Sequence, residues 1–202
     1  MTVAAALSVV REQVLPLDFP DRAALVAELD AAIRDRTVKD LTHALRTTLC
    51  RIIRTGAIRL PDVVYAPVAG HYARREIHRS AELGYSVIAM TWGPGQGTLV
   101  HDHSGMWCVE GVIHGDIEIV QYELISREGE LFRFEQRGTI NAGAGSAGSL
   151  IPPHEYHTIA NPSTEETAVS LHIYSGCMTC CSVFKPLGGH WYQREQKSLA
   201  LD

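Results

Sequence analysis

The spacing of apolar residues changes near residue 85, and this change limits the fold more than any other feature of the sequence. Before it, residues 25–35 and 41–55 carry apolar side chains every three or four positions, which predicts amphipathic helices. After it come short alternating or β-branched stretches separated by Gly, Asn and Pro: residues 86–93, 98–103, 107–115, 116–125, 131–138, 156–161 and 167–175. Such a series of short strands indicates an antiparallel barrel or jelly roll.

The length of 202 residues suits one domain, and a hydrophobic content of 46% is enough to bury a sizeable core. The sequence contains no internal repeat and no flexible linker. We therefore expect a single domain over residues 1–202, with a helical N-terminal part (1–60), a β-barrel (61–187) and a C-terminal tail (188–202). The expected fold class is mainly β, a barrel covered by an N-terminal helical layer.

Charge and composition exclude several classes of partner. A formal net charge of -5 gives no basic footprint for nucleic acid, and no apolar run reaches the roughly 20 residues of a membrane helix. The first residues lack the basic region of a signal peptide, so they predict the start of a helix. Five cysteines, an odd number, indicate reduced thiols and a cytoplasmic protein. The oligomeric state is not readable from the sequence.

Two histidines, His101 and His103, stand two positions apart in a predicted strand. Alternate residues of a strand share a face, so these imidazoles lie roughly 6.5 Å apart at their Cα atoms and can converge on one metal ion. Asp102 points to the opposite face and is not expected to ligate. Taken alone, the pair fits solvated or core histidines as well as a metal site.

The residues around this pair resemble the two sequence motifs of the cupin superfamily. The first motif is matched by Gly95, His101, His103 and Gly115, with Cys108 where many cupins have a glutamate ligand, and the second by Pro152, His157 and Asn161. Together with YAR (72–74), WGPGQGTLVHDH (92–103), HTIAN (157–161) and AVSLHIYS (168–175), the chain is similar to the cysteine dioxygenase family. The similarity runs from about residue 60 to 185.

The resemblance implies a cupin (jelly-roll) barrel that binds Fe(II) through His101, His103 and His157. It implies an enzyme that oxidises L-cysteine with O2 to cysteine sulfinate, so that the partners are a small thiol and dioxygen. Three neutral imidazoles without a glutamate leave the full positive charge on the ion, which suits an incoming thiolate. Ligand type alone does not separate iron from zinc, nickel or copper.

Cys108 has two interpretations. A free cysteine packs well as a small core residue. The resemblance implies instead a thioether cross-link to Tyr174, which eukaryotic members of the family carry, whereas many bacterial relatives have glycine at the cysteine position. Both partners are present, and the sequence does not decide between the two interpretations.

Ser170, His172 and Tyr174 alternate along a predicted strand and therefore share one face. Such a row fits a hydrogen-bonded barrel interior. The resemblance implies a relay in which Ser170 orients His172, which holds the Tyr174 hydroxyl near the reacting atoms.

Arg74 lies in YARRE, which we assign to a helix or loop before the first strand, and a surface arginine is its ordinary interpretation. The resemblance implies that Arg74, with Tyr72, binds the substrate carboxylate, since a guanidinium forms two parallel hydrogen bonds to such a group. Arg75 is expected to face elsewhere.

Cys177, Cys180 and Cys181 are crowded together, but no second cysteine pair completes a zinc ribbon, so we interpret them as structural or incidental thiols. His154 is expected near the mouth of the site and not as a fourth ligand.

Two other functions compete with cysteine oxidation. A 3-mercaptopropionate dioxygenase lacks the clamp arginine and carries one after the last site strand, whereas this chain has Arg74 and no arginine in residues 178–184. A non-catalytic cupin that binds a ligand or regulates another protein is the alternative from a different class. An intact histidine set beside Tyr174 favours catalysis.

Overall fold

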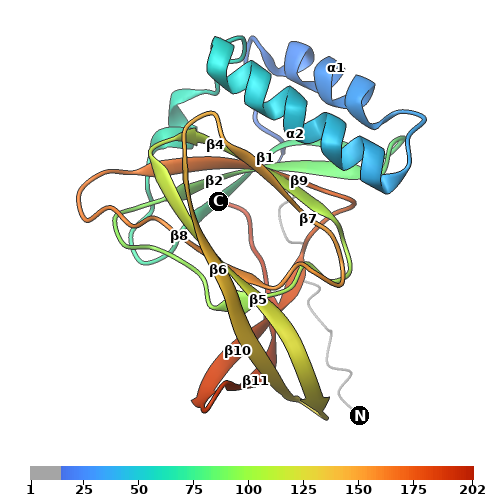
Figure 1. Ribbon diagram of the computed structural model, residues 1–202. Coiled ribbons are helices and arrows are strands. Elements are labelled where there is room, and N and C mark those ends of the chain that lie inside the picture. Colours follow the sequence, from blue (N-terminus) through green and yellow to red (C-terminus); the bar gives the residue numbers. More distant parts are fainter. Residues whose placement is uncertain (1–14) are drawn as a thin grey trace, which may run out of the picture.

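The computed structural model describes residues 15–202; the segment 1–14, where the sequence predicted the start of a helix, lies outside the described residues. Two helices precede the strands (Figure 1). The elements are α1 (Arg22–Ile33), α2 (Val38–Thr55), the 3-10 helix η1 (Asp62–Tyr65), β1 (Ala73–Ser80), β2 (Tyr85–Trp92), β3 (Val100–His101), β4 (Cys108–His114), β5 (Asp116–Glu128), β6 (Leu131–Gly143), β7 (Ala147–Leu150), β8 (His157–Ala160), β9 (Ala168–Tyr174), β10 (Cys180–Gly188) and β11 (Trp191–Ser198).

The strands form two antiparallel layers. One is a five-stranded sheet in the order β1-β2-β9-β4-β7, and the other contains β10, β11, β6, β5, β8 and β3. Helices α1 and α2 lie side by side over the five-stranded sheet, while the β5–β6 and β10–β11 hairpins extend away from the helices (Figure 1). The prediction of a mainly β cupin barrel with an N-terminal helical layer is confirmed.

The helical layer is held by apolar packing on the outer face of the five-stranded sheet. Leu45 and Leu49 of α2 are fully buried and belong to one core cluster with Val109, Leu171 and other residues of the sheet. A leucine side chain contributes about 1.5–3 kcal/mol when it is fully buried. Both helices that the sequence predicted are present, and their apolar faces cover the sheet.

Strand β9 is buried on both faces, and its side chains alternate between an apolar face and a polar face. Val169, Leu171 and Ile173 face the helical layer and belong to its core. The alternate residues Ser170 and His172 face the space between the two layers, where the hydroxyl and the imidazole hydrogen bond to each other. The polar row predicted from the sequence thus lies inside the barrel.

Two residues of the cupin-like motifs shape the chain without reaching the site. Gly115 joins β4 to β5 with a φ of +69°, and a Cβ there would lie 2.8 Å from the carbonyl oxygen of Thr167. The side-chain amide of Asn161 donates to the carbonyl oxygens of Trp92, Gly93 and Glu166. These contacts fix the loop that leads into β3.

The sequence missed four strands. Strand β1, expected as a helix or loop, contains the charged residues Arg74, Arg75 and Glu76, and each of them is buried and contacts polar partners. Strands β7, β10 and β11 contain glycine, proline or mostly polar residues, which weakens their alternating pattern. The region 188–202, expected as a tail, contributes β11, which pairs with both β10 and β6. Within residues 15–202, no helix combines the length and the apolar content that crossing a membrane requires.

Candidate functional site

Three histidines from separate segments meet between the layers. His101 ends β3 and pairs in register with His157, the first residue of β8. His103 lies two residues beyond the end of β3, so the prediction that both His101 and His103 belong to one strand is wrong; the strand ends at His101. The ring centroids lie 4.4 to 5.5 Å apart, and one ligand atom of each residue lies within 4.8 Å of the others.

The hydrogen bonds of the histidines leave metal-binding nitrogens free. Nδ1 of His101 lies 3.1 Å from the carbonyl oxygen of Leu99, and Nδ1 of His157 lies 2.7 Å from that of Glu155. Each Nδ1–H donates to its carbonyl, so Nε2 presents its lone pair, the arrangement found around metal-bound histidines. His103 Nδ1 is buried and has no hydrogen-bond partner in the part of the chain that is described.

Burial keeps these imidazoles in the neutral form that binds metal. It lowers the pKa of His101 and lowers the pKa values of His103 and His157 well below the ordinary value. Three neutral nitrogen donors fit a divalent transition metal, and the donor set by itself does not select iron.

Two neighbouring residues do not join this set. Asp102 points away, and its carboxylate accepts hydrogen bonds from the backbone N–H groups of Ser104 and Ser182. His154 is exposed and lines a separate surface pocket with Tyr156 and Arg137, so the prediction that it lies near the mouth of the site is wrong. Neither residue acts as a fourth ligand in this arrangement.

The polar row of β9 lies beside the histidines. Ser170 Oγ lies 2.7 Å from His172 Nε2, and Tyr174 Oη lies 3.4 Å from His172 Nδ1. The indole N–H of Trp92 donates to Ser170 Oγ at 2.9 Å. The Tyr174 ring is 5.7 Å from that of His103, so the row ends at the three-histidine group.

Burial also sets the protonation of this row. It lowers the pKa of His172 to about 3, with Arg74 adding to the effect, so the imidazole is neutral near neutral pH. Burial, followed by the nearby Cys108, raises the pKa of Tyr174 well above its ordinary value. Tyr174 therefore retains its phenolic proton.

Arg74 lies in β1 and is buried, with an exposed fraction of 4%, so it is not a surface arginine. Its guanidinium donates to the carbonyl oxygens of Met178, at 3.1 Å, and Ala200, at 3.2 Å. Nε is buried without a hydrogen-bond partner among residues 15–202. A buried, unpartnered donor on a fixed guanidinium fits an anionic ligand.

The adjacent Arg75 faces the other side of β1, as predicted. It donates to the Thr91 hydroxyl and to the carbonyl oxygen of Ala66, and it is 6% exposed. Tyr72 stacks on Trp92 with a ring-centroid distance of 4.6 Å. Tyr72 and Arg74 thus lie near the histidines, while Arg75 has a structural role.

A small inner cavity joins these groups. Its volume is about 20 Å³, and its lining includes the predicted site residues Tyr72, Arg74, His101, His103, His157, His172 and Tyr174. A second space of about 500 Å³, here called the vestibule, shares Tyr72, Thr98, His101 and Cys181 with the inner cavity. The two spaces therefore adjoin at these four residues.

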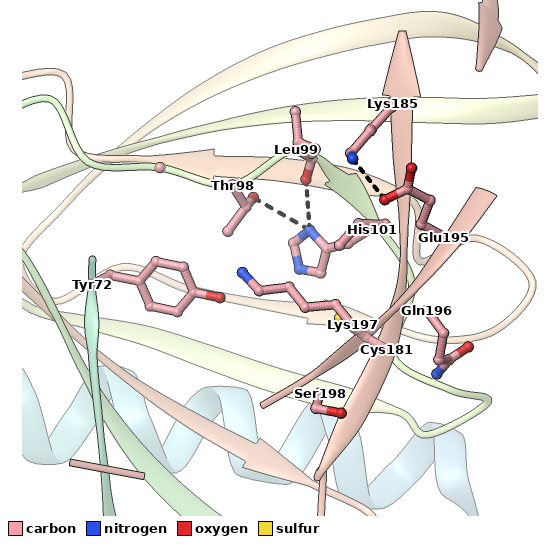
Figure 2. A pocket seen from close by; sticks show the side chains of 12 residues that line it. Tyr72, Thr98, Leu99, His101, Cys181, Lys185, Glu195, Gln196, Lys197 and Ser198 are labelled. Carbon is pink, nitrogen blue, oxygen red and sulfur yellow. Dashed lines mark hydrogen bonds and ion pairs between the residues drawn. The ribbon is translucent and has the colours of Figure 1, made fainter. Parts of the chain in front are cut away.

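Figure 2 shows the vestibule with the His101 imidazole near its centre. Lys197 of β11 extends between His101 and Tyr72, and its Nζ lies 5.4 Å from the centroid of the Tyr72 ring. Lys185 and Glu195 form an ion pair of 2.7 Å farther out. Lys197 thus brings a positive charge to the entrance of the inner cavity.

The cysteines separate into distinct environments, and all five are free thiols. Cys108 is fully buried and lies directly opposite Tyr174 in the β4–β9 register. Cys177 is exposed, whereas Cys181 lines both cavities and has its pKa raised to about 11 by burial. Cys181, interpreted above as incidental, is therefore part of the wall of the site.

Sequence reasoning missed several residues of the site. Met178 and Leu199 line the inner cavity, Lys197 lines the vestibule, and Glu110 lies 3.3 Å from His172 Nδ1. For Glu110 a signal was present, because alternation along residues 107–115 places it on the same face as Cys108. Nothing in the sequence pattern indicated that the C-terminal residues would return to Arg74.

Comparison with known proteins places these features in a family. Residues 69–186 match the family model described as "Cysteine dioxygenase type I". The chain is 26% identical over 135 residues to "Cysteine dioxygenase type 1" from Bos taurus, covering 63% of this chain and 62% of the bovine protein. It is 26% identical over 114 residues to the Homo sapiens protein of the same description, covering 52% of each. The chain thus spans between half and two thirds of these relatives.

Solved structures show similarity at lower levels. The TT1209 protein from Thermus thermophilus has a TM-score of 0.45 and 18% identity, over 59% of this chain and 96% of its own. A cupin 2 conserved barrel domain protein from Salinispora arenicola has a TM-score of 0.40 and 18% identity, over 58% and 86% of the two chains.

Proposed function

Because the chain belongs to the cysteine dioxygenase type I family, we propose that it is an iron-dependent dioxygenase that oxidises L-cysteine with O2 to cysteine sulfinate. The observation that carries the proposal is the convergence of three neutral imidazoles, a buried arginine and a tyrosine on one inner cavity. The fold, the histidine geometry and the family membership support this proposal.

We assign Fe(II) binding to His101, His103 and His157. When bound there, the ion supplies the centre at which dioxygen is activated and both oxygen atoms are transferred to the thiol sulfur. The protein contributes neutral nitrogen donors, and no carboxylate belongs to the three-histidine group. Cys181 does not compete with the substrate as a thiolate, because its raised pKa keeps it protonated.

Arg74 binds the substrate carboxylate in this proposal. Two of its N–H groups are held by Met178 and Ala200, which fixes the plane of the guanidinium, and Nε remains available. A charge-assisted pair with a carboxylate is stronger than a neutral hydrogen bond and also orients the substrate. The thiol end of cysteine then lies toward the histidines.

The size of the cavities decides where cysteine fits. The inner cavity, about 20 Å³, holds little more than one water molecule. Cysteine therefore occupies the inner cavity together with the adjoining part of the vestibule, and Tyr72 lines both spaces. Lys197 attracts the anionic substrate into this space, because it is the cation that reaches between Tyr72 and His101.

Tyr174 supplies the proton donor beside the reacting sulfur. Its raised pKa keeps the phenol protonated, and the imidazole of His172 holds the hydroxyl in position through a hydrogen bond. Cys108 stands opposite Tyr174, so the thioether cross-link is a prediction that the register allows. Intact-mass measurement tests it: a cross-linked chain is lighter by two hydrogen atoms than the Cys108→Ser variant after correction for the substitution.

The alternative substrate, 3-mercaptopropionate, also has a carboxylate but lacks the amine of cysteine. A 3-mercaptopropionate dioxygenase is expected to lack the clamp arginine, whereas here Arg74 lines the inner cavity, and this difference favours cysteine over the alternative. A non-catalytic cupin would bind a ligand in the same cavity without consuming oxygen.

Steady-state oxygen consumption by the iron-loaded protein separates these functions. We expect the highest kcat/KM with cysteine, a lower value with 3-mercaptopropionate and the lowest with cysteamine. Preference for 3-mercaptopropionate would assign the chain to the related activity. No oxygen consumption with any of the three thiols, despite bound iron, would remove the dioxygenase proposal and leave a binding function.

A further inference from the structure

A buried carboxyl group lies behind the proposed relay. Glu110 in β4 pairs in register with His172 in β9, and the two side chains face the same interior space. Glu110 Oε2 lies 3.3 Å from His172 Nδ1 but is not aligned for a hydrogen bond, and it has no other partner in residues 15–202. The residue is 5% exposed, so the orphaned oxygen is not satisfied by bulk solvent.

Glu110 borders a second cavity, here called the rear cavity, of about 340 Å³. Ser170 lines it from β9 and Arg46 lines it from α2, whereas His172 and Tyr174 line the inner cavity. The row from Ser170 to Tyr174 therefore connects two different spaces. Glu110 and Ser170 thus border a space whose lining does not include the three histidines.

His172 can carry its proton on either nitrogen, and each choice fixes the direction of the other hydrogen bonds. Ser170 Oγ accepts from Trp92 and can either donate to Nε2 of His172 or accept from it. With the proton on Nδ1, His172 donates toward Glu110 or Tyr174, and the Tyr174 proton is free to point into the inner cavity. With the proton on Nε2, Nδ1 is a hydrogen-bond acceptor, and the Tyr174 hydroxyl donates its hydrogen bond to Nδ1.

We propose that Glu110 is a positioning residue that selects the tautomer of His172 and thereby directs the hydroxyl proton of Tyr174. An ionised Glu110 places its negative charge 3.3 Å from Nδ1, so it favours the proton on Nδ1 electrostatically and leaves the Tyr174 proton facing the substrate. A protonated Glu110 removes this constraint, because the neutral carboxyl group no longer favours a proton on Nδ1. The relay row thus contains a fourth member, and its functional consequence rests on the proposed dioxygenase activity.

Both states of Glu110 are accessible near neutral pH, since burial raises its pKa to about 7. The ionisable groups nearest to it are Cys108 on its own strand and His172 and Tyr174 on β9, with Arg46 of α2 at the rear cavity. Arg74 of β1 acts on His172 from the far side. Strand β7, which also flanks β4, offers no ionisable side chain.

Nitrogen-15 NMR of the imidazole groups in the metal-free protein tests the tautomer directly. We expect the His172 nitrogens, identified by their absence from His172→Asn, to exchange tautomers with a midpoint near pH 7. In Glu110→Gln the tautomer no longer changes with pH. Glu76→Gln is the matched control, because Glu76 is an equally buried carboxylate that pairs with Arg79 and not with His172, and it should behave as wild type.

An infrared titration of the wild type provides a second measurement that does not depend on a folded variant. A protonated carboxyl band that disappears with the same midpoint as the His172 change supports the proposal. Different midpoints, or a His172 titration that is identical in wild type and Glu110→Gln, would overturn it.

Measurements of turnover separate this inference from the proposed function. In the iron-loaded protein we expect kcat with cysteine to fall at least tenfold below pH 7 in the wild type, and Glu110→Gln to lose that limb. If the decrease of kcat below pH 7 is the same in the wild type and in Glu110→Gln, the role of Glu110 is also contradicted. A protein without thiol oxidation refutes the proposed function, while the NMR result still decides whether Glu110 controls His172.

Discussion

Arg74 and Asp202 hold each other through two hydrogen bonds, although 128 positions separate them in the sequence. The backbone N–H of Arg74 donates to the Asp202 carboxylate at 2.9 Å, and the backbone N–H of Asp202 donates to the Arg74 carbonyl oxygen at 2.8 Å. The carbonyl oxygen of Ala200, two residues before Asp202, accepts from the Arg74 guanidinium. The C-terminal residues therefore fix the arginine that we assign to the substrate carboxylate.

Substitution of Asp202 tests this link. We expect Asp202→Ala to raise the KM for cysteine severalfold, since Arg74 loses one of its supports, and to change cysteamine oxidation little. Asp18→Ala, which removes an exposed carboxylate elsewhere, is the control. Burial acts to raise the pKa of Asp202, but hydrogen bonds from Arg74 and His71 outweigh it, and the pKa lies below its ordinary 3.8. The stabilisation by Asp202 is thus present above pH 3.8 and is lost as pH falls through its folded pKa.

Arg74→Ala should reduce kcat/KM for cysteine at least tenfold. Removing one partner of a buried, charge-assisted pair costs about 2–5 kcal/mol, and about 1.4 kcal/mol already corresponds to a factor of ten. Cysteamine has no carboxylate, so its slow oxidation should change little. The measurement is the ratio of the two kcat/KM values.

Arg75→Ala is the matched control for Arg74→Ala. Arg75 is also buried and holds Thr91 and Ala66, so its loss should lower the unfolding temperature. It should nevertheless leave the ratio of cysteine to cysteamine oxidation unchanged. An equal loss for both substrates in Arg74→Ala would argue against the carboxylate role.

Replacement of His101, His103 or His157 by Ala should abolish iron retention and oxygen consumption together. Each imidazole provides one of three donors, and removing one leaves too few ligands from the three-histidine group. Metal content after dialysis and circular dichroism distinguish loss of the ion from loss of the fold. His154→Ala should retain iron as the wild type does, because that exposed histidine is not part of the group. A variant of the three that keeps stoichiometric iron and normal turnover would exclude its histidine from the site.

Tyr174→Phe should lower kcat with cysteine by about 100-fold while changing KM little, because positioned proton donors contribute at least that factor. The ring, its packing and the opposing Cys108 remain in place. Iron content measured on the same sample confirms that the centre is intact. An effect on KM alone would show that Tyr174 contributes to binding and not to proton transfer.

Glu110→Gln should change the pH dependence of stability. The folded-state pKa of Glu110, about 7, is raised above its ordinary value of 4.5, so the folded protein binds a proton more tightly than the unfolded chain does. Stability therefore falls as pH rises from about 4.5 to 7, by roughly 3 kcal/mol at about 1.4 kcal/mol per pKa unit. Urea unfolding at pH 5 and pH 8 measures this, and the difference should shrink in Glu110→Gln but not in Glu76→Gln.

Local periodicity determined much of the fold. The three- and four-residue spacing of apolar side chains specified α1 and α2, and alternation specified β9 with its polar row Ser170, His172 and Tyr174. These features depend on residues close together in the chain, where helix and strand geometry dictate which side chains share a face. The sequence motifs around His101 and His157 also indicated the family, because they consist of residues close together in the chain.

Long-range pairing decided the rest. The meeting of His101 with His157 requires the β3–β8 pairing, and the approach of Glu110 to His172 requires the β4–β9 register. The sequence places Arg74 in a charged segment that resembles a loop, and only the tertiary structure supplies Met178, Ala200 and Asp202 as its partners. Polar residues become buried where distant segments satisfy their hydrogen bonds, and such partners leave no periodic trace in the sequence.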